Sequence, residues 1–349
     1  MIAAHTAITA EFVSPTSPST WSAIVHGRSA LLFALLAGIS VSLMTGRTRL
    51  PDVDRVPSLR LKLIGRGVAI FLIGVALELL GTGVAVVLTL YGALYLIALP
   101  FLRATKRTLL AWAAGVALVA PALTAAIQVI GRYPYGPGWS VLNQAAYPLG
   151  AWVALLLAGM AMGRCDLARR AVAVKILVSG AVLSAIGYGV GALGARFAAP
   201  MLAASEQGFP NGGPEIPPIA WGSLPGRLLA ALVDTTPHVG STAEILGSGG
   251  FAALVIGACL LIAGPLRAVI LPVAALGAMP LTVYSLHVVA YWAIAGYGGR
   301  IESNAVFWGM TIAALVGSTL WSVLRGRGPL ERAPLALGNA MMRTPQPRV

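Results

Sequence analysis

Long apolar runs, separated by short polar segments, occupy most of this chain. A bilayer core of about 30 Å needs roughly 20 apolar residues of helix for one crossing. Runs of this kind lie at residues 29–46, 67–81, 83–102, 108–130, 147–163, 171–194, 249–266, 269–296 and 304–324. Only the turn Gly81-Thr82-Gly83 separates the second run from the third, and we interpret these two as short spans. The pattern predicts an all-α, polytopic transmembrane helix bundle.

The first residues form an incomplete span. Met1 to Val13 are apolar over about half the length that a crossing needs. They carry neither the basic start nor the small-residue cleavage site of a signal peptide. We interpret them as the outer half of a first helix that begins before Met1. The expected total is therefore about ten spans, the first of them N-truncated.

The longest segment outside the apolar runs is 195–248, which contains seven prolines. It is too rich in proline for one helix and too apolar for a disordered linker. We expect it to fold as short helices that cap the outer surface. Because no internal repeat is visible, residues 1–349 are predicted to form a single transmembrane domain, with 195–248 as its extracytoplasmic cap segment.

The composition excludes a water-soluble protein. Hydrophobic residues make up 58% of the chain and charged residues 10%, with a mean hydropathy of +0.84, whereas a soluble domain is about 25% charged. The net charge of +13 does not indicate nucleic acid, because 19 of the 24 Lys and Arg residues fall in alternate loops and the C-terminal tail. The positive-inside rule makes those segments cytoplasmic. This predicts a multi-pass protein of the cell membrane, in contact with membrane lipid, with a cytoplasmic C-terminus and residues 14–28 outside.

Histidines are the strongest candidates for chemistry in this chain. All four, His5, His26, His238 and His287, are predicted in the outer half of the membrane or on its outer face. Imidazole is a natural general base near neutral pH, so His5, His26 and His287 are the catalytic candidates. The alternative is that each histidine only forms an interhelical hydrogen bond.

Five other polar positions are candidate substrate-binding residues: Arg28, His238, Glu244, Thr282 and Tyr284. Arg28 either holds an anion or anchors its helix at the interface. Thr282 and Tyr284 either donate hydrogen bonds to a developing oxyanion or join neighbouring helices. We expect the three membrane histidines to line one pocket, with Arg28 and Glu244 at its mouth and His238 folded over it.

Other chemistries are not indicated. Cys165 and Cys259 show neither a disulfide framework nor metal-ligand spacing, and we expect no metal. The chain has no phosphate-binding glycine loop, no GxSxG nucleophile motif and no paired-carboxylate site.

Six stretches resemble bacterial relatives of the heparan-alpha-glucosaminide N-acetyltransferase catalytic domain and the related YeiB-type membrane proteins. They are Met1–His5, Gly27–Ser40, Tyr147–Arg164, Pro237–Ser248, Leu281–His287 and Gly328–Glu331. The second is similar to the pattern GR-S-x-x-LF-x-LL-x-G-x-S, the fifth to LT-x-Y-x-x-H, and the last matches GPLE. The stretches follow one another in the same order along nearly the whole chain.

This resemblance implies an integral membrane acyltransferase. Such an enzyme moves an acyl group, acetyl in the characterised animal members, from cytosolic acyl-CoA to an outward-facing glycan or lipid-linked sugar. The co-substrate is then acetyl-CoA or another acyl-CoA. In the animal enzymes a catalytic histidine precedes a Trp in the first outer loop, but here Pro18-Ser19-Thr20 precedes Trp21. His26 and His287 are the available substitutes, and His5 occupies the polar position of the first helix.

Two other functions stay open. A transporter or flippase would use the same outer cavity without covalent chemistry, and the prolines Pro272 and Pro280 that break the run 269–296 would suit it. A non-catalytic membrane scaffold would tolerate loss of the histidines. Formation of a homo-oligomer is open as well.

Overall fold

The computed structural model describes residues 1–8, 16–17, 20, 22, 28–130, 148–206 and 224–342, and every regular element in these ranges is a helix. This confirms the predicted all-α class. The chain divides into two compact units. Unit 1 comprises Met1–Ser29, Val41–Arg103 and Cys259–Val349, and unit 2 comprises Ala30–Ser40 and Ala104–Ala258. The single transmembrane domain stays a prediction.

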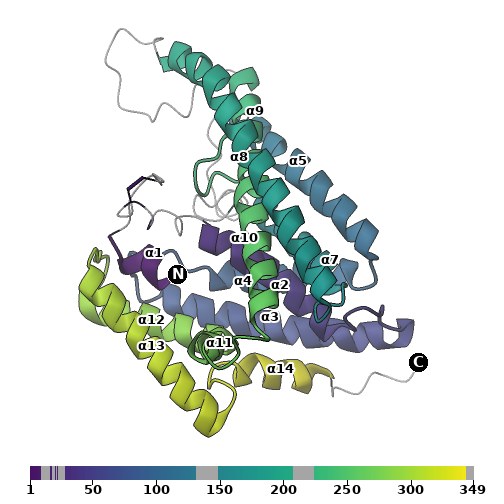
Figure 1. The fold of residues 1–349 in the computed structure, drawn as a ribbon, viewed down its shortest axis with the longest axis vertical. Coiled ribbons are helices and arrows are strands. Elements are labelled where there is room, and N and C mark those ends of the chain that lie inside the picture. Colours follow the sequence, from purple (N-terminus) through teal and green to yellow (C-terminus); the bar gives the residue numbers. More distant parts are fainter. Residues whose placement is uncertain are drawn as a thin grey trace. The chain divides into compact units, whose positions relative to one another are not determined.

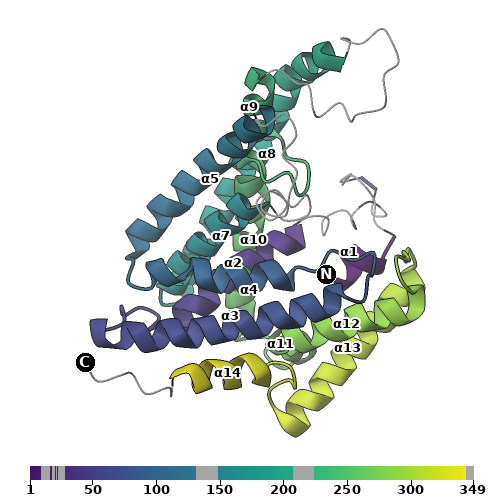
Figure 2. The same ribbon diagram turned by 180° about the vertical axis from the view of Figure 1, so that it is seen from behind.

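Unit 1 draws its helices from both ends of the chain (Figures 1 and 2). They are α1 (Ile2–Thr6), η2 (Val53–Arg55), α3 (Val56–Glu78), α4 (Leu88–Ile97), η3 (Leu99–Phe101), α11 (Leu271–Ala278), α12 (Pro280–Ala295), α13 (Asn304–Arg325) and α14 (Arg332–Met342). Unit 2 contains α5 (Lys106–Ile130), α7 (Leu149–Gly163), α8 (Arg170–Glu206) and α9 (Leu224–Val233). Most of α2 (Arg28–Met44) and α10 (Thr242–Ile262) also belongs to unit 2.

Several helices are built to cross a membrane. Within the described residues four qualify by length and composition, α5, α8, α10 and α13, and α11 with α12 forms a fifth if that bent pair is one span. The helices α2, α4 and α7 are apolar but shorter. These helices identify a membrane protein. They do not confirm the predicted ten spans.

The basic segment 47–66, which separates two of the apolar runs, is helical over its second half because α3 begins at Val56. Pro57 stands in the first turn of α3, where its missing N–H leaves no hydrogen bond unmade. The arginines and lysine that follow are good helix formers.

The predicted cap is not confirmed as a set of short helices. α8 continues to Glu206, well into the segment 195–248, and α10 already begins at Thr242. α9 is the one short helix that the structure describes in this segment, and residues 207–223 lie outside the described ranges.

The α3–α4 hairpin and α14 form one part of unit 1. α3 ends at Glu78, so the predicted break at Gly81-Thr82-Gly83 is confirmed. Gly81 has φ +57°, a backbone conformation that glycine adopts without strain, and a Cβ there would lie 2.0 Å from the Tyr297 ring. α14 runs along α3 in both views of the ribbon (Figures 1 and 2). This helix lies in the C-terminal segment, where the apolar pattern predicted no helix.

Two glycines bring α2 and α7 into close contact within unit 2. A Cβ at Gly38 would lie 2.0 Å from the Leu156 carbonyl oxygen, and a Cβ at Gly159 would lie 2.1 Å from that of Leu35. Without a hydrophobic driving force between helices in lipid, such close backbone packing is a main source of association. The contact therefore depends on both glycines.

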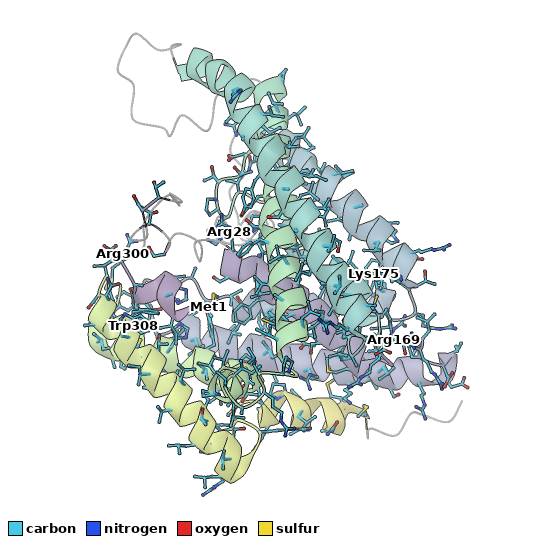
Figure 3. All side chains as sticks on the ribbon, viewed as in Figure 1. Met1, Arg28, Arg169, Lys175, Arg300 and Trp308 are labelled. Atoms are coloured by element: carbon cyan, nitrogen blue, oxygen red, sulfur yellow. The ribbon has the colours of Figure 1, made fainter. Side chains whose placement is uncertain are left out.

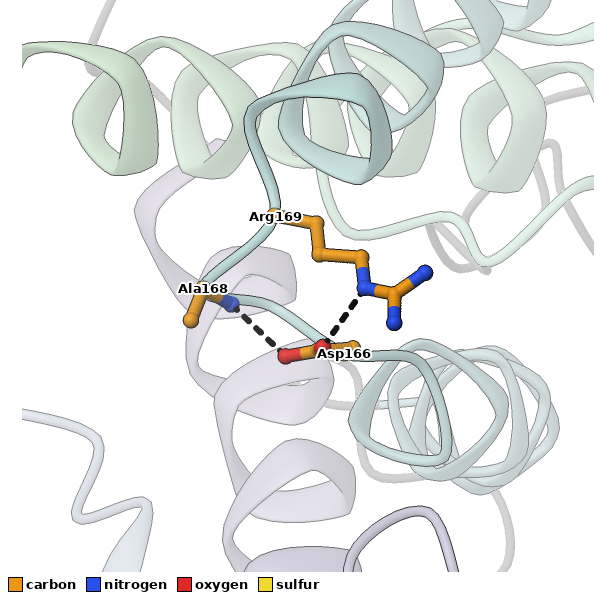
Figure 4. A network of polar contacts seen from close by, with 3 residues as sticks. All are labelled: Asp166, Ala168 and Arg169. Carbon is orange, nitrogen blue, oxygen red and sulfur yellow. Dashed lines mark hydrogen bonds and ion pairs between the residues drawn. The ribbon is translucent and has the colours of Figure 1, made fainter.

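The turn between α7 and α8 is polar and exposed (Figure 4). Arg169 Nε donates to Asp166 Oδ2 at 2.9 Å, and the Ala168 backbone N donates to Asp166 Oδ1 at 3.4 Å. A surface ion pair of this kind contributes about 0–1 kcal/mol, so its main effect is to shape the turn. Lys175 follows on the same end of α8 (Figure 3). These charges lie in a segment that the positive-inside rule places in the cytoplasm.

Replacing Gly159 by leucine tests the close packing of α2 and α7. The larger side chain meets backbone rather than a movable side chain, so we expect a loss of at least 1–3 kcal/mol, typical of overpacking. Fluorescence-detected size-exclusion chromatography after heating measures the loss of monodisperse protein. Gly115→Leu is the control, since a Cβ at Gly115 meets no atom within 4 Å. Equal heat resistance of the two variants would contradict the packing.

Single cysteines test the predicted orientation. In a background without Cys165 and Cys259, we expect Glu302→Cys to react with an impermeant maleimide in intact cells. Ala168→Cys, in the exposed α7–α8 turn, should react only after lysis. The opposite pattern would place the C-terminus outside.

Candidate functional site

α12 carries three predicted site residues, Thr282, Tyr284 and His287, and begins at a sharp bend. The axes of α11 and α12 differ by 85°, and Met279 between them has non-helical angles (φ −126°, ψ 46°). Pro280 stands at the start of α12, where its missing N–H is tolerated. The following backbone N–H groups have no partner within the helix and need one in apolar surroundings.

Glu331 supplies these partners. Its Oε1 accepts hydrogen bonds from the backbone N of Leu281 at 2.8 Å and of Thr282 at 3.0 Å. Its Oε2 accepts from Thr282 Oγ1 at 2.5 Å, and that hydroxyl accepts from the Leu330 backbone N at 3.1 Å. The positive end of the helix dipole also favours a carboxylate here. The loop before α14 therefore holds the start of α12.

His287, on the second turn of α12, forms a hydrogen-bonded pair with His5 of α1. Its Nε2 lies 2.9 Å from His5 Nδ1, and the two rings stack with centroids 5.2 Å apart. The His287 side chain is only 4% exposed. The contact joins residues 282 positions apart and confirms the prediction that these two histidines meet.

The 2.9 Å contact joins two ring nitrogens, so one of them carries a hydrogen and the other presents a lone pair. The tautomer of each ring decides which nitrogen donates. If His5 Nδ1 is the donor, neutral His5 keeps a lone pair on Nε2, which is the form that a general base requires.

Tyr284 holds the His287 ring from its side. The two rings meet edge to face, with centroids 4.9 Å apart and planes at 82°. The Tyr284 hydroxyl accepts a hydrogen bond from the Val87 backbone N at 3.1 Å, which links α12 to the start of α4. Because the phenol accepts in this bond, it keeps its own O–H for donation.

A cavity of about 370 Å³ lies beside His287, between α12 and α13. Its lining residues are Ile2, Met279, Thr282, Val283, Leu286, His287, Ala290, Met310, Ala313, Ala314, Gly317, Ser318, Trp321 and Pro329. Most of these side chains are apolar. His5 does not line this cavity and reaches it only through His287.

Arg28 begins α2 and is half-buried. Its neighbour Ser29 contacts the Met1 sulfur, with Oγ 3.7 Å from Sδ, so the start of α2 adjoins α1. α1 also packs against α13, the helix that carries Trp308 (Figure 3). The catalytic candidate His26 lies outside the described residues.

His238 and Glu244 belong to unit 2, where the carboxylate braces its own loop. Glu244 is 2% exposed, and its two oxygens accept from the backbone N of His238 at 2.7 Å and of Gly240 at 2.6 Å. Its own N donates to Ser241 Oγ at 3.0 Å, which caps α10. His238 has φ +71°, a conformation that this brace stabilises. Glu244 thus has a structural role, and contact of either residue with substrate stays a prediction.

Metal chemistry has no support in the described part of the chain. No group of three or more His, Cys, Asp or Glu residues there is arranged to hold a metal ion. Cys165 and Cys259 are both free thiols.

Glu331, which holds the start of α12, is the residue of this site that sequence reasoning missed. It stands in the GPLE stretch, to which the resemblance gave no role, and 44 positions separate it from His287. An acidic residue in a basic C-terminal segment was the available signal. The groups that it binds are backbone N–H groups at the start of α12, and only the folded structure brings them close to Glu331.

The comparisons with known proteins agree with the resemblance. The model of the family described as "Heparan-alpha-glucosaminide N-acetyltransferase, catalytic" matches residues 1–189. The match includes His5 and Arg28 and ends before α12. No curated protein and no solved structure matches the chain.

Removing the Glu331 carboxylate should loosen the start of α12. Glu331→Ala leaves two buried N–H groups without partners, at about 1–3 kcal/mol each, so we expect a Tm several degrees lower. Glu331→Gln keeps an acceptor oxygen and should retain most of the stability. The exposed Glu302→Ala is the control. A Glu331→Ala protein that melts like the wild type would show that the cap is dispensable.

Proposed function

Because the chain belongs to the heparan-alpha-glucosaminide N-acetyltransferase catalytic family, we propose that it is a membrane acyltransferase with His5 as its general base. The hydrogen bond between His5 and His287 is the observation that carries this proposal. The family suggests membrane N-acetyltransferase activity in general. We propose further that the donor is a cytosolic acyl-CoA and that the acceptor is an outward-facing glycan or lipid-linked sugar. The setting is the cell membrane, with the C-terminus in the cytoplasm.

The histidine pair suits acyl transfer from a thioester. His5 Nε2 takes the proton of the acceptor amine or hydroxyl as its nitrogen or oxygen attacks the thioester carbonyl. The new C–N or C–O bond forms, the C–S bond breaks, and the proton passes from His5 to the sulfur of the leaving CoA. The His287 Nε2 lone pair accepts the Nδ1 hydrogen of His5 and stabilises the imidazolium between these steps. His287 is thus a positioning residue for His5.

The other predicted residues take secondary roles in this proposal. The Tyr284 O–H is a candidate donor to the oxyanion that forms on the thioester carbonyl, as is Arg28. The Thr282 hydroxyl is already bonded to Glu331, so its contribution is to hold α12. His26 is proposed on the acceptor side, and contact of His238 and Glu244 with substrate stays a prediction.

The bend between α11 and α12 also suits a transporter, because broken helices offer a free N-terminus to a substrate. Here the Glu331 carboxylate occupies that N-terminus. A substrate therefore does not find this N-terminus free, and the family favours acyl transfer over transport.

Substitution of the pair tests the proposed function. With full-length protein in lipid nanodiscs, radiolabelled acetyl-CoA and a nitrophenyl glucosaminide as probe amine, we expect His5→Ala to lower kcat by about 10²–10⁴-fold. His287→Ala should lower kcat less. His287→Gln, whose side-chain oxygen accepts the His5 hydrogen, should recover part of the loss.

The matched control is Leu79→Ala, at a side chain that is 80% exposed and lies in the same unit. It should keep the wild-type rate. Acyl transfer by His5→Ala at the wild-type rate would rule out His5 as the base. Absence of transfer by the wild type with every acyl-CoA would refute the acyltransferase proposal.

A further inference from the structure

The cavity beside His287 is open along one side. Leu286 is 62% exposed, and Ala313 and Gly317 are exposed as well, so the lining reaches the surface of unit 1. α13, which carries two of these residues, is long and apolar enough to cross a membrane. An apolar opening on such a helix faces the bilayer rather than water. The acyl chains of membrane lipid are therefore available to cover it.

The cavity has the length of one lipid leaflet. On α13 its lining runs from Met310 to Trp321, which is about 16 Å of helix, and half of the bilayer core is about 15 Å. α12 contributes the stretch from Thr282 to Ala290, and the two helices lie side by side in both views of the ribbon (Figures 1 and 2). An extended chain of a single leaflet thus matches this seam in length.

The polar side chains in the lining already have partners in the protein. Thr282 donates to a carboxylate, and Ser318 and Trp321 donate to backbone carbonyls. His287 is paired with a second histidine. An aliphatic chain in the cavity therefore gains apolar contact without leaving a polar group unpaired.

Three arginines lie around the Trp321 end of the cavity. Arg325, on the last turn of α13, places its guanidinium over the Trp321 ring, with Cζ 5.9 Å from the ring centroid. Trp321 Nε1 donates to the Arg327 carbonyl at 3.0 Å, and Arg332 donates to the Arg325 carbonyl at 3.5 Å. All three arginines are exposed. A triple positive charge therefore stands where the apolar cavity ends.

The protein does not neutralise this charge. No acidic side chain in the described part of the chain forms an ion pair with the three arginines. Glu331, the nearest in sequence, gives both carboxylate oxygens to the start of α12. Basic residues beside a membrane span attract anionic lipid headgroups. The cluster thus complements an anionic headgroup better than a zwitterionic one, which brings its own cation.

We propose that this part of unit 1 binds an anionic phospholipid. The lipid phosphate lies at Arg325, Arg327 and Arg332, Trp321 stands at the level of the glycerol, and one acyl chain follows the cavity between α12 and α13. The lipid belongs to the leaflet on the side of the arginines, which the positive-inside rule predicts to be cytoplasmic. Because His287 lines the cavity, the bound chain packs beside the histidine pair.

Binding of defined lipids to the full-length protein in detergent provides the first test. Native mass spectrometry compares phosphatidylglycerol with phosphatidylcholine of the same chain length. Wild type should bind phosphatidylglycerol at least tenfold more tightly, since each basic side chain near an anionic headgroup contributes roughly fivefold in affinity. The combined variant Arg325→Gln, Arg327→Gln and Arg332→Gln should lose this preference. Equal affinity of the wild type for the two lipids would overturn the proposal.

A second combined variant removes the same charge from other elements of unit 1. Arg55→Gln, Arg60→Gln and Arg103→Gln replace exposed arginines on or beside η2, α3 and η3. This variant should keep the wild-type preference for phosphatidylglycerol. An equal loss in the two combined variants would show that only net charge matters, and the site at the end of α13 would be refuted.

Gly317→Leu tests the path of the acyl chain. Gly317 lines the cavity and has open space at its Cβ, so the leucine fills the seam and should weaken phosphatidylglycerol binding at least tenfold. Gly309→Leu is the matched control, because Gly309 lies on the same helix, does not line the cavity and also has open space. It should bind like the wild type.

Coenzyme A, which carries phosphates but no lipid chain, distinguishes a lipid from a soluble ligand. It should not displace phosphatidylglycerol from the wild type. Displacement by coenzyme A would make a soluble phosphate the occupant of the arginine cluster and would overturn the lipid site. Wild-type affinity in Gly317→Leu would also overturn it, because the chain would then lie outside the cavity.

Discussion

A helix that starts inside an apolar layer must find partners for its first N–H groups, and α12 finds them in Glu331. The 85° bend and Pro280 leave these N–H groups without partners in their own helix, and Glu331 in the loop before α14 supplies the acceptor oxygens. Tyr284 and His287 stand on the first two turns after this cap. The position of the histidine pair therefore depends on a carboxylate that does not touch it.

The pair itself follows from the chemistry of two imidazoles. One N–H···N bond requires a donor and an acceptor, so at least one ring is neutral. In the proposed mechanism His5 is the donor in this bond and keeps a basic lone pair on Nε2. Tyr284 limits rotation of the His287 ring from the side. In the proposed mechanism this is the order of a base and its orienting partner.

Unit 2 uses the same physical device at a second helix start. The Glu244 carboxylate accepts from two backbone N–H groups just before α10, and Ser241 caps the helix. Among the described residues, the buried Glu244 and the half-buried Glu331 both accept hydrogen bonds from backbone N–H groups near a helix start. An acidic side chain beside a membrane span is thus as well explained by an unpaired helix N-terminus as by a substrate.

The sequence by itself determined where most helices lie, because the burial of apolar runs in lipid is a local property of each run. It also predicted that His5 and His287 meet, since their distances from the helix ends place them at similar depths. The placement of His26, His238 and Arg28 around them stays a prediction. Only the tertiary structure decided the extension of α3 to Val56, the helix α14, the cap by Glu331 and the bonding of Glu244 within its own loop. These features depend on hydrogen bonds and backbone contacts that form only when distant segments pack together, and no local hydrophobic pattern encodes them.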